Sequence, residues 1–67
     1  MAVTFWRVDN AEVFEVAAST PGEGLREIAR LLERKAGTGE PVMPISISPF
    51  CEKGAKEPYM FTVTVEE

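Results

Sequence analysis

One short segment near the middle of the chain carries the start signal of an α-helix, and it constrains the fold more than any other feature. Thr20-Pro21-Gly22-Glu23 has the form of a capping box, in which the Thr20 hydroxyl accepts from the Glu23 amide and the Glu23 carboxylate accepts from the Thr20 amide. Proline is favoured at the first helical position, where its missing N–H leaves no hydrogen bond unmade. Gly37 can adopt the left-handed conformation that ends a helix. The sequence therefore predicts one helix over residues 21–36.

The apolar residues of this helix recur at the spacing of a single helical face. The predicted stripe consists of Leu25, Ile28, Ala29, Leu32 and Ala36, with Leu31 at its border. Such a stripe is about 100° wide and packs against one other layer of the protein. We therefore expect the helix to cover one side of a sheet.

Two strand pairs flank the predicted helix. The four predicted strands span residues 3–8, 12–18, 42–48 and 59–65. The first two are rich in β-branched and aromatic residues around the turn signal Asp9-Asn10, and the last two alternate apolar with polar residues. Residues 49–58 are predicted as a loop. The result is a single small α+β domain over residues 1–67, with the element order ββαββ.

This order and length resemble the β-grasp arrangement, a four-stranded mixed sheet with one helix packed on one face. The first and last strands then lie parallel at the centre, which gives the strand order 2-1-4-3. Pro44 favours an edge position for the third strand, because proline cannot donate to a central ladder. Glu12 and Glu15 are expected to discourage unwanted pairing along the second strand as the other edge.

The composition includes few residues that could catalyse a reaction or bind a metal ion. The 67 residues include one cysteine and no histidine, so no intrachain disulfide can form and the usual zinc ligand sets are missing. Cys51 lies near Lys53 and Lys56, which favour a thiolate, but no histidine or second cysteine accompanies it. We therefore predict an inert thiol, no catalytic activity, no resident metal or cofactor, and no small-molecule ligand.

The neighbours Phe5 and Trp6 place one large aromatic on each face of the sheet, because successive strand residues point to opposite sides. The helix-facing side is predicted to hold Phe5, Phe14, Val16, Ile45, Ile47, Phe61 and Val63. The candidate interaction face on the other side consists of Trp6, Val8, Val13 and Met60, rimmed by Thr4, Glu15, Ser46, Thr62 and Thr64. Apolar patches with a polar rim often mark association, which we favour here because so small a core calls for a partner; the alternative is that Trp6 is an isolated surface aromatic.

Arg26, Arg30 and Arg34 recur every four residues and form a basic ridge along the helix. Such a ridge could bind phosphate groups, which gives the alternative function of a small nucleic-acid-binding regulator. The simpler interpretation is a solvent face of i,i+3 ion pairs with Glu23, Glu27 and Glu33.

The net charge of −4 disfavours nucleic acid and anionic membranes as partners. No apolar run approaches the roughly 20 residues of a membrane span, and no signal peptide is evident, so we expect a cytoplasmic protein. Ten glutamates against one aspartate is a bias seen in heat-adapted proteins, and the alternative is that so short a chain acquired it by chance. A chain this short buries only about 60% of its unfolded surface, which favours a stabilising partner. The leading hypothesis is a non-catalytic interaction module that forms a homodimer or binds another protein through the helix-free face.

Overall fold

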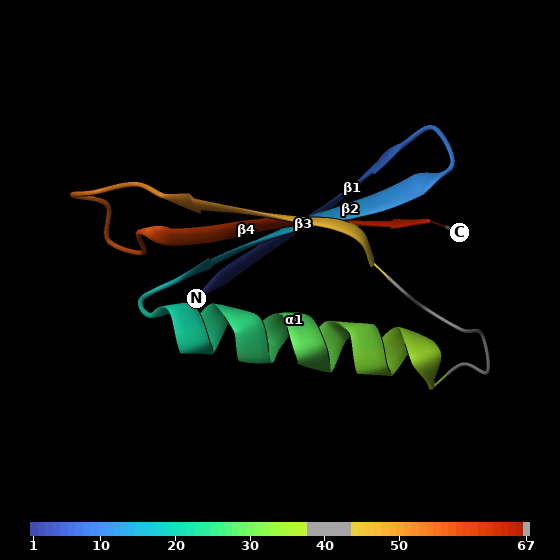
Figure 1. Cartoon of the computed structure of the whole chain (residues 1–67), viewed down its shortest axis with the longest axis horizontal. Helices are drawn as coiled ribbons and strands as arrows, with labels where there is room; N and C mark the ends of the chain where they lie inside the picture. Colours follow the sequence, from blue (N-terminus) through green and yellow to red (C-terminus); the bar gives the residue numbers. More distant parts are fainter. Residues whose placement is uncertain (38–43, 67) are drawn as a thin grey trace.

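The computed structural model describes residues 1–37 and 44–66, apart from the side chains of residues 35 and 36. Its elements are β1 (Ala2–Val8), β2 (Ala11–Ala18), α1 (Pro21–Ala36), β3 (Pro44–Cys51) and β4 (Tyr59–Glu66). The helix lies along one side of a single twisted sheet (Figure 1). This confirms the α+β class and the predicted bounds of the helix. Residues 42 and 43 of the third predicted strand lie outside the described residues. That strand continues through Pro49 and Phe50 to Cys51, which the sequence had placed in the loop.

Hydrogen bonds of the cap explain where the helix begins. The Glu23 amide donates to the Thr20 hydroxyl at 3.2 Å, as predicted. The Glu23 carboxylate accepts from the Ser19 amide at 3.3 Å, one residue before the predicted donor. At the other end, the Gly37 amide donates to the Glu33 carbonyl at 2.9 Å. The φ angle of Gly37 is not in the left-handed region, so the predicted left-handed stop is wrong.

The sheet order is β1-β2-β4-β3 with every neighbouring pair antiparallel, so the predicted order 2-1-4-3 is wrong. The parallel central pair of the β-grasp arrangement is missing from the described sheet. The predicted edge position of β3 is confirmed, but the second edge is β1 and not β2. The physical reason is burial: β2 has buried residues on both of its faces, Val13 on one and Phe14 on the other. A strand that is buried on both faces belongs at the centre.

The core lies between α1 and the two central strands. Its largest fully buried side chains are Phe14, Val16 and Val63, and α1 adds Ile28 and Leu31. The helix is rotated from the predicted stripe, because Leu31 is buried whereas Leu25 is 51% exposed. Ala29 is also exposed, and the side chain of Ala36 lies outside the described part.

Gly24 explains this rotation. It is buried, and a Cβ placed on it would lie 2.5 Å from Cε2 of the Phe61 ring. The helix backbone therefore approaches β4 at Gly24, more closely than any larger residue would permit. With Gly24 facing the sheet, the helical period carries Ile28 and Leu31 into the core and turns Leu25 aside.

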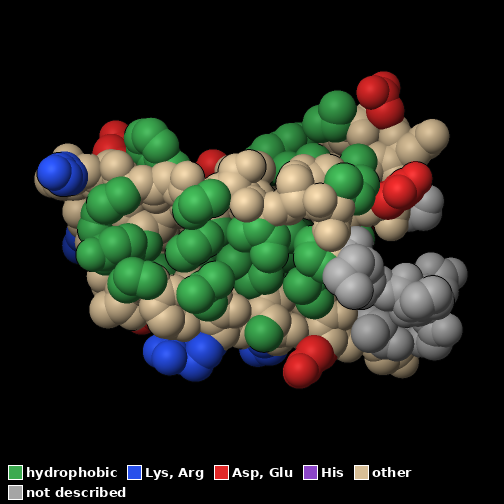
Figure 2. Space-filling model, viewed as in Figure 1, with side chains coloured by type: hydrophobic (Ala, Val, Ile, Leu, Met, Phe, Trp, Pro, Cys, Tyr) green, Lys and Arg blue, Asp and Glu red, His purple; other side chains and the backbone are tan. Residues whose placement is uncertain are grey.

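α1 lies over β2 and β4, and the two edge strands extend beyond it. Figure 2 shows hydrophobic side chains gathered along the side of the molecule where β3 lies above α1. At the other edge, Phe5 faces the helix side but remains 53% exposed, even though its ring lies 5.9 Å from the Phe14 ring between centroids. The helix thus leaves apolar surface uncovered at both edges.

Candidate interaction face

The strand register places the predicted interaction residues together on the helix-free face. Trp6 lies opposite Val13, and Val13 lies opposite Thr64 on the next strand. Val8 follows Trp6 by two residues, and Met60 lies opposite Ala17 farther along the same face. The four residues therefore lie on the same face of the sheet, as predicted, and their role in binding stays a prediction.

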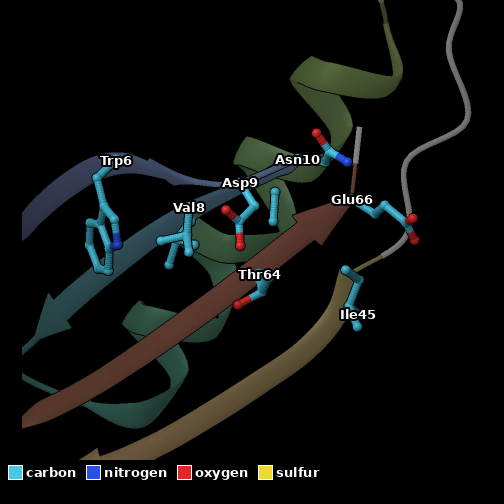
Figure 3. A pocket seen from close by; sticks show the side chains of 9 residues that line it. Trp6, Val8, Asp9, Asn10, Ile45, Thr64 and Glu66 are labelled. Atoms are coloured by element: carbon cyan, nitrogen blue, oxygen red, sulfur yellow. The ribbon is translucent and has the colours of Figure 1, made fainter.

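An open hollow of about 600 Å³ lies on this face, near the turn between β1 and β2 (Figure 3). Its apolar lining consists of Trp6, Val8, Ala11, Val13 and Ile45, and its polar lining of Asp9, Asn10, Thr64 and Glu66. The helix passes behind the strands in this view, so the hollow opens away from the core (Figure 3). Met60 is not among its lining residues.

The side chains that line the hollow differ in their exposed fraction, because neighbouring strands cover some of them and not others. Val13 is only 6% exposed, because Trp6 and Thr64 flank it on the neighbouring strands. Ile45 at the opposite side is 58% exposed. The hollow therefore has a covered floor and exposed apolar walls, and a side chain that entered it would remove those walls from water.

Ile45 is a lining residue that sequence reasoning missed. Strict alternation placed Ile45 and Ile47 together on the helix side. The structure has a register irregularity between Pro44 and Ser46, and Ile45 lines the hollow while Ile47 stays opposite Val63. A β-bulge of this kind inserts one residue and re-aims a side chain. Pro44 was the available signal, because proline in a strand occurs at edges and bulges.

Two carboxylates give the rim of the hollow a negative charge. Asp9 comes from the turn, where it has a φ of 54°, and Glu66 comes from the end of β4. Both residues are exposed. An apolar floor beside two carboxylates suits an apolar group that carries a positive charge next to it.

The basic ridge is partly neutralised within the helix. Arg30 donates to Glu27 through Nε at 2.8 Å and through Nη2 at 2.5 Å, which forms one of the predicted i,i+3 pairs. The hydrogen bond from Arg30 lowers the pKa of Glu27, and the same hydrogen bond raises the pKa of Arg30. Arg26 and Arg34 are exposed.

Other candidate chemistry remains sparse. Cys51 is exposed at the end of β3. Among the residues with described positions, no three histidine, cysteine or acidic side chains are grouped so that they could hold a metal ion. The helix of the described chain is too short and too polar to cross a membrane.

No family model, curated protein or solved structure matches the chain.

Proposed function

We propose that the chain is a small, non-catalytic protein-interaction module that binds its partner through the helix-free face. The observation that carries the proposal is the hollow, which has a nearly buried floor at Val13 and exposed apolar walls. Its walls come from three different strands, β1, β2 and β3, so the sheet itself fixes their positions. A few anchors in well-packed pockets supply most of the energy of protein interfaces, and tryptophan, here Trp6, is enriched among them.

The charge around the hollow narrows the chemistry of the partner. Asp9 and Glu66 stand at the rim, and the whole chain has a net charge of −4. A segment with one large apolar side chain and a neighbouring lysine or arginine complements both features. Such a partner would gain from burial in the hollow and from the rim carboxylates together.

Trp6 gives the experiment its readout, because it is the only tryptophan of the chain. Peptides displayed on phage would be selected on the wild-type protein and then measured by the change in Trp6 emission. The proposal expects selected peptides that combine an apolar residue with a basic one. Val8→Lys should abolish their binding, since it puts a charge in the apolar wall.

Phe50→Lys is the matched control, because it adds the same charge outside the hollow. Phe50 is an exposed apolar residue on the same face, opposite Met60, but it does not line the hollow. Binding that survives Phe50→Lys and fails in Val8→Lys supports the hollow. Peptides that bind both variants equally, or a selection that yields no peptide affected by Val8→Lys, would reject the proposal.

The alternative function, nucleic-acid binding through Arg26, Arg30 and Arg34, has less support. The ion pair with Glu27 occupies Arg30, and the net charge of −4 opposes phosphate binding. It predicts salt-dependent binding of RNA or DNA that disappears when the three arginines are changed to glutamate. Absence of binding by the wild-type chain at low salt would dismiss it.

A further inference from the structure

The two edges of the sheet differ in their ability to accept another strand. The outer strand β3 contains Pro44 and Pro49, which have no N–H to donate. The outer strand β1 runs over Ala2–Val8 and contains no proline. Prolines and charges are the usual means by which proteins block an exposed edge. The β1 edge therefore lacks the backbone block that protects the β3 edge.

The hairpin shows which backbone groups of β1 point outward. Val8 and Ala11 are paired, with only Asp9 and Asn10 between them. The closing pair of a two-residue hairpin exchanges both of its backbone hydrogen bonds, so the N–H and C=O of Val8 point toward β2. The direction alternates along the strand. The outward groups consequently belong to Val3, Phe5 and Arg7.

We propose that a second copy of this chain pairs with β1 edge to edge, antiparallel and centred on Phe5. Phe5 then lies opposite Phe5 of the partner subunit, and Val3 lies opposite Arg7 of the partner subunit. Each outward N–H meets an outward C=O, because both residues of every such pair present both groups. This register uses all seven residues of β1, whereas a centre at a neighbouring residue leaves some of them unpaired.

The side chains agree with this arrangement. No two like charges come opposite each other, since Arg7 is the one charged residue of β1 and meets valine. Phe5, which is 53% exposed, would be covered by its counterpart at the two-fold axis. A two-fold axis perpendicular to the sheet keeps both helices on one side and both hollows on the other. The inference thus goes beyond the proposed function: it uses the backbone edge and presents two hollows on one continuous face.

The size of the contact sets the conditions of the test. Seven strand residues extend about 23 Å, and a sheet layer is about 10 Å thick, so the edge covers roughly 230 Å² in projection. This lies below the roughly 800 Å² per partner of a standard stable interface. We therefore expect a dimer that exchanges with monomer at micromolar to millimolar concentration.

The experiment follows amide hydrogen exchange and light scattering of the wild-type chain from 10 μM to 2 mM. The expected result is a rise toward the dimer mass, with protection of the Val3, Phe5 and Arg7 amides rising over the same range. Ile47 and Cys51 lie two residues before and after Pro49 on β3, so their amides point outward on the same edge. These amides serve as the internal control. Their exchange should not depend on concentration.

A variant pair tests the geometry. Phe5→Lys places like charges at the two-fold axis and should hold the chain monomeric, whereas Phe50→Lys makes the same change near the other edge and should leave the dimer intact. Circular dichroism checks that each variant is folded. A monomer throughout the wild-type series would overturn the proposal, and so would a dimer whose Val3, Phe5 and Arg7 amides gain no protection. If the chain dimerises without protecting these amides but with a change in Trp6 emission, edge pairing is overturned. The proposed function of the helix-free face is then still supported.

Discussion

The close approach of α1 to β4 predicts that Gly24→Ala destabilises the protein, although alanine is the better helix former. A Cβ at residue 24 would lie 2.5 Å from Cε2 and 2.8 Å from Cδ2 of Phe61, and 3.5 Å from the Ala18 Cβ. The Phe61 ring is only 8% exposed and has little room to move away. The helix must therefore shift outward from the sheet, or the ring must leave its position in the core.

Two opposing magnitudes decide the sign. Replacing glycine by alanine within a helix stabilises it by about 1 kcal/mol. Overpacking a core costs about 1–3 kcal/mol, and a contact as short as 2.5 Å belongs at the upper end of that range. The net result should be a loss of about 1–2 kcal/mol in the free energy of unfolding. For a domain of this size, that corresponds to a fall of roughly 5–15 °C in the melting temperature.

The assay is urea and thermal unfolding followed by far-ultraviolet circular dichroism, with Gly22→Ala as the control. A Cβ on Gly22 would lie 3.1 Å from Nη1 of Arg26, the end of an exposed and flexible side chain. Gly22→Ala should therefore be neutral or stabilising by up to about 1 kcal/mol. The double variant Gly24→Ala/Phe61→Leu should lose less free energy of unfolding than the two single variants lose when their losses are added. A Gly24→Ala variant as stable as the wild type would refute the close packing of α1 on Phe61.

Three further predictions concern the turn, the cap and the ion pair. Asp9→Gly should stabilise the hairpin by about 0.5–1 kcal/mol in chemical unfolding, because Asp9 has a φ of 54° that glycine adopts without steric cost; a loss of stability would contradict this. Thr20→Ala should cost about 1 kcal/mol by the same assay, since it removes the acceptor of the Glu23 amide, while Thr20→Ser should cost much less. The Glu27 carboxyl should titrate below its usual range by NMR and return toward it in Arg30→Gln. Because the folded-state pKa of Glu27 is lowered, this pair supports folding above the ordinary glutamate pKa and its contribution disappears as the pH falls; an unchanged titration in Arg30→Gln would exclude the ion pair as the cause.

The start of the helix could be predicted to the residue because its signal is local. Thr20 and Glu23 form the cap within one turn, and no distant part of the chain is needed to interpret them. The rotation of the helix could not be predicted in the same way. A count of apolar positions gives glycine no weight, yet the backbone at Gly24 is what touches Phe61. The stripe built on Leu25 was therefore displaced by one residue.

The sheet order depended on comparisons between distant segments. β1 and β2 have similar apolar content, and local patterns do not reveal that Val13 is buried on the face opposite Phe14. The identity of one edge was available from Pro44, whose effect on the backbone is local. The facing of Trp6, Val8 and Val13 was also predictable, because alternation along a strand does not depend on strand order. The facing of Ile45 was not predictable from alternation, because the strand register is irregular beside Pro44.

The prolines of β3 have a consequence for the size of any assembly. A sheet with two receptive edges can add strands at both ends, and repeated addition of that kind produces fibres. Here Pro49 interrupts the donors of one edge, and the proposed pairing uses only the other edge, β1. When two β1 strands have paired, the eight-stranded sheet ends in a proline-containing β3 at each side. The proposed edge pairing would therefore be self-terminating and would stop at two chains.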